Sequence, residues 1–153
     1  MGVISEEVYQ TVEKKLRQRD RMIRRAEEAV ARAREKAGGL SSPSGPRIGP
    51  KGGKPESRVE RAALAVVRAE KRLEKALKWE AVFRETDRIY PKDTNEGYVA
   101  GMIYGNGLTQ AELARISGCS RHTVKLRQDR YVIRAAFLAV QAGLIREEVS
   151  DDG

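Results

Sequence analysis

The chain has 153 residues, of which 34% are charged and 5% aromatic, and its formal net charge is +8 at pH 7. This length accommodates one domain, or a small domain with an extended arm, and so few aromatic residues argue against a large compact core. The excess of positive charge favours a polyanionic partner, either nucleic acid or an anionic membrane surface. The single cysteine, Cys119, excludes an intrachain disulfide and a cysteine-rich metal site.

The sequence also bears on where the protein works. No apolar run approaches the ~20 residues that span a bilayer. Residues 1–10 lack the basic start and apolar stretch of a signal peptide. A lone cysteine fits a reducing compartment. We therefore expect a cytoplasmic protein with no membrane partner.

A first long helix is predicted within residues 1–37. Residues 5–37 lack proline and glycine and are rich in strong helix formers, and Gly38 should end the helix. Alternating spacings of three and four define a heptad seam that only Arg19 interrupts. So narrow a seam needs a partner helix, either from this chain or from another copy. Because Arg19 lies in the seam, we expect the partner to place an acidic side chain opposite it or to leave an opening there. The seam comprises Tyr9, Val12, Leu16, Arg19, Ile23, Ala26, Val30, Ala33 and Ala37.

Residues 38–55 are predicted to be a flexible linker. They contain four of the five prolines, six glycines and three serines, which disfavour any regular element. Such a linker lets a second helix fold back on the first, and it also lets the N-terminal arm dock elsewhere. Its basic residues, Arg47, Lys51 and Lys54, can follow a DNA backbone, although a solvated linker is the simpler interpretation.

A second long helix is predicted over residues 56–90, closed by Pro91. Its apolar residues follow helical spacing, and its many charges are interpreted as a solvated surface. Trp79 and Phe83 lie one turn apart. We expect them to anchor this helix to the C-terminal domain, the alternative being a contact with a partner protein.

Residues 91–146 are predicted to form the last domain, followed by an acidic tail over 147–153. Asp93 and Glu96 have the spacing of a capping box, which would begin an apolar helix that ends at residues 105–107. Beyond Arg130 the apolar pattern continues without a helix breaker to about Gly143. A support helix and a long final helix therefore flank the segment between them.

That segment, residues 108–130, has the pattern of a helix-turn-helix. Thr109 and Glu112 form a capping-box pair, Gly118 can adopt a positive φ at the turn, and Ser120 can cap the second helix. Two helices joined so tightly cross at a steep angle, so a small residue is needed between them. Ala114 is that residue, and the expected core around it is Leu113, Ile116 and Val124.

The outer face of the second helix predicts contacts with DNA. Residues 115–134 hold six basic residues and one acid, whereas a merely soluble surface mixes the two signs. The residues expected to contact base edges in the major groove are Arg121, His122, Lys125 and Gln128. The residues expected at phosphates are Thr109, Arg115, Ser120, Arg127, Arg130 and Arg134.

The helix-turn-helix resembles that of bacterial sigma-70 region 4 and of phage late-gene activators. The resemblance lies in Glu112-Leu113-Ala114, Gly118, Ser120, Thr123-Val124-Lys125 and Arg127. With the long helices and the Gly/Pro-rich linker, the layout is similar to the RinA/ArpU type of phage transcriptional regulators. This resemblance implies an activator that acts at a promoter in the host bacterial cytoplasm, associated with the nucleoid, with double-stranded DNA and RNA polymerase as partners.

The sequence thus predicts an all-α fold, with two long helices as a helical hairpin or coiled-coil arm and a C-terminal helix-turn-helix domain. The sequence leaves open whether the protein forms homodimers or higher oligomers through its long helices. The main alternative is a DNA-packaging component similar to a small terminase subunit, which would form a ring. An enzyme is not expected, because the only histidine is His122, and no cofactor or metal is predicted.

Overall fold

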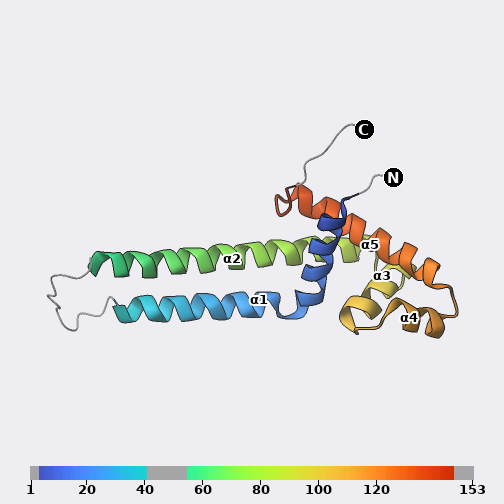
Figure 1. The fold of residues 1–153 in the computed structure, drawn as a ribbon, viewed down its shortest axis with the longest axis horizontal. Helices are drawn as coiled ribbons and strands as arrows, with labels where there is room; N and C mark the ends of the chain where they lie inside the picture. The colour runs from blue at the N-terminus through green and yellow to red at the C-terminus, as the bar shows by residue number, and fades with distance from the viewer. Residues whose placement is uncertain (1–3, 41–54, 147–153) are drawn as a thin grey trace. The chain divides into compact units, whose positions relative to one another are not determined.

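The computed structural model describes residues 4–40 and 55–146, and these residues form helices and connecting turns without strands. The prediction of an all-α fold is confirmed. Figure 1 shows the elements in chain order. They are α1 (Glu6–Leu40), α2 (Pro55–Ile89), α3 (Asn95–Ala100), the π-helical turn η1 (Gly101–Gly105), α4 (Gln110–Ser117) and α5 (Arg121–Gln141).

The chain divides into two compact units that do not follow the helix boundaries. We name Arg21–Leu77 the helix-pair unit, and Met1–Asp20 with Lys78–Gly153 the core unit. Each long helix therefore contributes to both units. The predicted division had assigned each long helix as a whole, because periodicity along one helix does not show where its packing partners change.

Both ends of the predicted linker are helical. α1 continues through Gly38 and Gly39 to Leu40, so the predicted end of the helix at residue 37 was three residues early. α2 begins at Pro55, where a missing amide hydrogen costs nothing because the first helical amides have no intrahelical partner. The predicted basic linker residues and the acidic tail lie outside the described residues.

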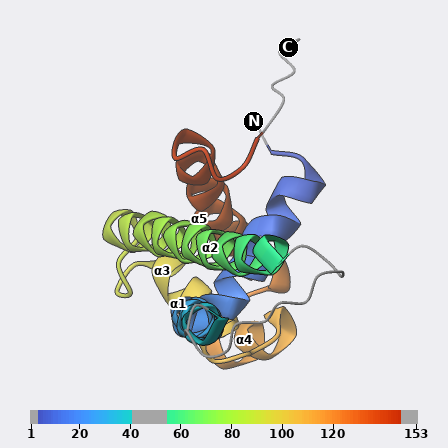
Figure 2. The same ribbon diagram turned by 90° about the vertical axis from the view of Figure 1, so that its left-hand side faces the viewer.

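In the helix-pair unit, α1 and α2 run antiparallel and side by side, as the cyan and green helices in Figures 1 and 2 show. Ala26 and Val30 of α1 are buried, as is Ala69 of α2. Arg34 Nη2 lies 2.7 Å from Glu70 Oε2, which sets the register of the two helices. The heptad seam of α1 thus has its partner in the same chain.

In the core unit, α3 begins one residue later than the capping-box spacing predicted. Thr94, not Asp93, caps the helix, and its hydroxyl oxygen accepts a hydrogen bond from the Gly97 amide at 3.1 Å. A Cβ at Gly97 would collide with the backbone carbonyls of Tyr90 and Pro91. Because Gly97 has no side chain, the first turn of α3 can lie directly against the backbone of Tyr90 and Pro91.

The core unit is organised around α5, which packs against α3 and α4. The buried core cluster consists of Val99, Ile103, Leu113, Ala114 and Val124. Ile116 was expected in this core and is instead 65% exposed. At 100° per residue, Ile116 points well away from the direction shared by Leu113 and Ala114.

Candidate nucleic-acid interface

α4 begins with the predicted capping box. The Glu112 amide donates to the Thr109 hydroxyl oxygen at 3.1 Å, and the Thr109 amide donates to Glu112 Oε1 at 2.9 Å. The helix ends at Gly118, whose φ of 71° is a left-handed conformation that favours glycine. Both local predictions are confirmed.

α5 follows after a three-residue connection, Gly118 to Ser120. The Ser120 hydroxyl oxygen accepts from the Thr123 amide at 3.1 Å, which caps α5 as predicted. Val124 is fully buried against α3, η1 and α4, and this contact fixes the rotation of α5 about its axis. The side chains on the other side of its first two turns are thereby turned outward.

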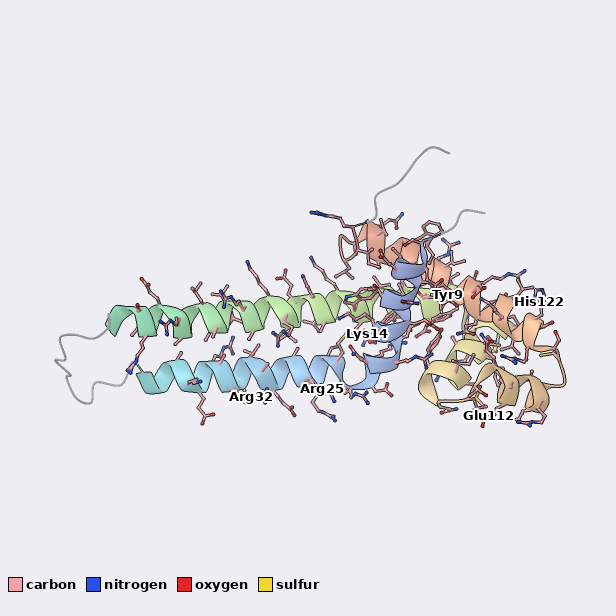
Figure 3. All side chains as sticks on the ribbon, in the orientation of Figure 1. Tyr9, Lys14, Arg25, Arg32, Glu112 and His122 are labelled. Atoms are coloured by element: carbon pink, nitrogen blue, oxygen red, sulfur yellow. The ribbon has the colours of Figure 1, made fainter. Side chains whose placement is uncertain are left out.

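Most of the predicted DNA-contacting residues are exposed. Arg121, His122 and Lys125 all face outward, and His122 is labelled near the start of α5 in Figure 3. Leu126 lies beside them and is 43% exposed. Among the predicted phosphate contacts, Thr109, Arg115, Ser120, Arg130 and Arg134 are exposed, and Arg127 is half-buried.

Two of the exposed cations already have protein partners. Lys125 Nζ lies 3.0 Å from Asp129 Oδ2 and 5.9 Å from the ring centroid of Tyr9. Arg130 Nη1 lies 3.1 Å from Glu96 Oε2. The two cations remain more than half exposed, at 56% and 60%, so a phosphate can still reach them.

Gln128 does not belong to the exposed set, so its predicted contact with a base is corrected. Its side chain is 4% exposed, and Nε2 donates to the Tyr104 hydroxyl oxygen at 2.7 Å and to Glu13 Oε2 at 3.1 Å. Its Oε1 accepts from Gln110 at 2.6 Å. Gln128 therefore joins α5 to α1, η1 and α4.

Two tyrosines extend this support beneath α5. Tyr104 donates its hydroxyl hydrogen to Glu13 at 2.5 Å, and Tyr9 donates to Asp129 at 2.6 Å. Burial raises the pKa of both phenols well above their usual range, and the hydrogen bonds to carboxylates add to the shift. Both therefore stay neutral donors. This role was not predictable from the sequence, since Tyr9 and Glu13 belong to a helix more than 90 residues away from their partners.

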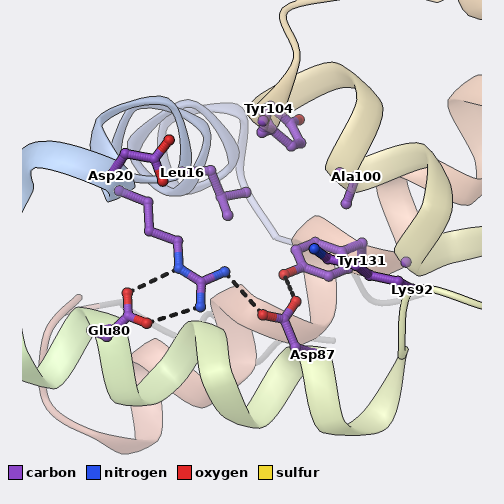
Figure 4. Close-up of a pocket in the computed structure, with 12 residues that line it drawn as sticks. Leu16, Asp20, Glu80, Asp87, Lys92, Ala100, Tyr104 and Tyr131 are labelled. Atoms are coloured by element: carbon purple, nitrogen blue, oxygen red, sulfur yellow. Dashed lines mark hydrogen bonds and ion pairs between the residues drawn. The ribbon is translucent and has the colours of Figure 1, made fainter.

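A second polar cluster lies around a cavity of about 480 Å³ in the core unit (Figure 4). Arg19 pairs with Glu80 and Asp87, each at 2.9 Å, and Tyr131 donates to Asp87 at 2.6 Å. The acid expected opposite Arg19 is thus supplied by α2. Hydrogen bonds from Arg19 lower the pKa of Glu80 below its usual value. Because these charges pair with one another, we interpret the cluster as structural.

Trp79 and Phe83 are both buried, as expected of an anchoring pair. Both rings lie close to cations of α1, and a contact of the pair with the C-terminal domain stays a prediction. Lys15 Nζ is 6.0 Å from the Trp79 ring centroid, and the Arg19 guanidinium carbon is 5.6 Å from that of Phe83. The pair therefore joins α2 to the first half of α1.

Within residues 4–40 and 55–146, no cluster of three or more His, Cys, Asp or Glu side chains is arranged to hold a metal ion. In the same residues, no helix combines the length and apolar character needed to cross a membrane. Comparisons of the chain with protein-family models, curated proteins and solved structures found no match. Its function is therefore inferred from its own residues.

Proposed function

We propose that this protein is a sequence-specific, double-stranded-DNA-binding transcriptional regulator that uses α4 and α5 as a helix-turn-helix. One observation carries the proposal. Arg121, His122 and Lys125 are exposed together on the first two turns of a helix whose inner side is held by buried Val124. In helix-turn-helix proteins, it is this N-terminal part of the second helix that contacts base edges in the major groove.

The exposed groups suit the chemistry of the major groove. The Arg121 guanidinium can donate two hydrogen bonds to O6 and N7 of guanine, which is worth ~1–3 kcal/mol of discrimination. His122 and Lys125 can donate to other base acceptors. Leu126 presents an apolar surface of the kind that contacts the thymine methyl group.

Phosphate contacts would set affinity and register. Arg115, Arg127, Arg130 and Arg134 surround the proposed base-contacting residues in the sequence. The caps Thr109 and Ser120 mark helix starts, where free amides and the helix dipole attract anions. Each neutralised phosphate contributes about −0.9 to the slope of log K against log salt, so these four arginines would contribute about −3 to −4.

The regulatory part of the proposal rests on the resemblance to sigma-70 region 4 and to RinA/ArpU-type phage regulators. By that resemblance the protein would act at a promoter of phage or prophage late genes, with RNA polymerase as a further partner. DNA binding by itself would not distinguish activation from repression.

Selection of bound sequences from a pool of random duplexes tests the proposal. We expect a recurring motif to be enriched, and we expect the Arg121→Ala variant to lose preference at one position of that motif. Symmetric half-sites would indicate a dimer on DNA. Recovery of unselected sequence after repeated rounds would contradict sequence-specific binding.

A further inference from the structure

Charge is distributed unevenly around the helix-pair unit. Its buried and half-buried residues define the a and d positions of a heptad, with Val30 at a and Ala26 at d in α1, and with Leu73 at a and Ala69 and Ala76 at d in α2. Arg34 and Glu70 both fall at e positions, and their ion pair places the e positions of the two antiparallel helices on one side. The g positions, with the neighbouring c positions, therefore share the opposite side.

This second side, which we name the basic side, carries eight cations. They are Arg25, Arg32, Lys36, Arg58, Arg61, Arg68, Arg72 and Lys75, and all are exposed. Within residues 21–40 and 55–77, no g or c position holds Asp or Glu. The e and b positions, in contrast, carry Glu27, Glu60, Glu70 and Glu74 beside Arg24 and Arg34.

A groove confirms that the two helices meet along the basic side. It encloses about 540 Å³ and is lined by Arg32, Ala33, Glu35 and Lys36 of α1 and by Ala65 of α2. Glu35 occupies an f position, at the outer edge of this side. Arg32 and Lys36 of α1 therefore border the groove, and α2 contributes Ala65, which occupies a g position.

On α2 the arrangement opposes the stability of the helix itself. Arg68 and Arg72 are like-charged at i,i+4, with no acid three or four residues away from either, and such a pair costs ~0.2–0.5 kcal/mol in a helix. Neither arginine forms an ion pair within the described part of the chain. A surface selected only for solubility would intersperse the two signs.

We propose that the basic side binds the phosphate backbone of double-stranded DNA without reading its sequence. Six of the eight cations are arginines, whose planar guanidinium matches phosphate with paired hydrogen bonds. The row on α2, from Arg58 to Lys75, extends about 25 Å at 1.5 Å per residue. Duplex DNA carries one charge per ~1.7 Å of its axis, so a row of this length can meet several phosphates.

Other polyanions fit the basic side less well. Residues 21–77 contain no Phe, Trp or Tyr, so this unit lacks the stacking platforms used on single strands. The large apolar side chains exposed on α2 within the helix-pair unit, namely Val59, Leu64, Val67 and Leu77, all lie outside the g and c positions, which leaves no apolar wedge for a bilayer. The choice of DNA over duplex RNA rests on the proposed function.

The test compares two double variants of the full chain that lose the same charge. Arg32→Gln with Arg68→Gln removes two c-position cations from the basic side. Arg24→Gln with Lys71→Gln removes two exposed cations from b and f positions, outside it. Binding to a random-sequence 40-base-pair duplex is measured by fluorescence anisotropy across a range of KCl concentrations, and circular dichroism checks that both variants keep their helix content.

We expect the basic-side variant to bind at least ~10-fold more weakly at 0.1 M KCl and to lose about two units of salt slope, while the control variant loses less than half a unit. Equal losses in both variants would overturn the proposal. So would tighter binding of the unaltered protein to duplex RNA or to phosphatidylserine vesicles than to duplex DNA.

A third variant, Arg121→Ala with Lys125→Ala, separates this inference from the proposed function. If it keeps full affinity and sequence preference while the basic-side variant loses affinity, the helix-turn-helix proposal fails and the basic side stands as a duplex-binding surface. If it loses sequence preference while the basic-side variant behaves as the unaltered protein does, the basic-side inference alone fails.

Discussion

The side-chain nitrogen of Gln128 lies 2.7 Å from the hydroxyl oxygen of Tyr104 and donates a hydrogen bond to it. Tyr104 in turn donates to Glu13, and Gln110 donates to Gln128. Residues from α1, η1, α4 and α5 thus share one network, within two turns of α5 from the exposed Arg121 and Lys125. The network holds α5 against the other three elements.

Gln128→Ala should lower the free energy of unfolding by roughly 1–3 kcal/mol, because it leaves buried polar partners unsatisfied. It should leave the DNA motif unchanged, since Gln128 is 4% exposed. Urea denaturation and selection from random duplexes measure the two effects. A changed motif with unchanged stability would show that Gln128 contacts bases after all.

Arg19→Met should cost roughly 1–3 kcal/mol of stability, because the charged hydrogen bonds to Glu80 and Asp87 are lost from a site where Arg19 is 25% exposed. Arg34→Met is the matched control. Its ion pair with Glu70 is 64% and 45% exposed, so it should cost less than ~1 kcal/mol. Urea midpoints compare the two, and equal losses would argue against the Arg19 cluster as a structural centre.

Stability should fall in acid. Because hydrogen bonds from Arg19 lower the pKa of Glu80 below its ordinary value of 4.5, the unfolded chain takes up this proton first as the pH falls. The contribution is complete above pH 4.5 and is lost as the pH falls through the folded-state pKa. The melting temperature is measured from pH 6 to 3, and Arg19→Met should flatten the curve. Parallel curves for the two proteins would contradict the assignment.

Gly97→Ala should be strongly destabilising, since the added Cβ collides with backbone carbonyls that cannot rotate away. Gly101→Ala, four residues later, meets open space and should be neutral or slightly stabilising, because alanine restricts the unfolded chain more than glycine does. Thermal melting compares the two. Similar melting temperatures would mean that the turn after α2 relaxes around the methyl group.

Features governed by neighbouring residues were predictable from the sequence. The capping box at Thr109, the turn at Gly118 and the cap at Ser120 each depend on residues within four positions. The cap of α3 was misplaced because Asp93 and Thr94 offer competing local solutions. The choice between them depends on how closely Gly97 approaches the preceding turn, which is a tertiary contact.

Features governed by distant residues were not predictable. Gln128 lies seven positions after exposed Arg121 and four after buried Val124, so periodicity alone did not decide its side, and the prediction that it faces outward was wrong. In the structure Val132, which shares that side, is fully buried, and Glu13 contacts Gln128 across 115 residues. Likewise Arg19 indicated that an acid faces it, but only the register of α1 on α2 identifies Glu80 and Asp87.

The charges of the long helices show the same limit. Taken one helix at a time, residues 56–90 mix both signs and resemble a solvated surface. Once the pair of Arg34 with Glu70 shows the register, the acids are seen to occupy e, b and f positions, and the basic side is left without any at its g and c positions.

The most direct measurement of the central claim is the ratio of affinities for the selected DNA site and for a scrambled duplex of the same composition. Arg121→Ala should reduce this ratio by about 5- to 150-fold, which corresponds to the ~1–3 kcal/mol of one bidentate base contact. Arg84→Ala, an exposed arginine of α2 in the same unit, should leave the ratio unchanged. An unchanged ratio in Arg121→Ala, with Lys125→Ala and His122→Ala equally without effect, would contradict base recognition by α5.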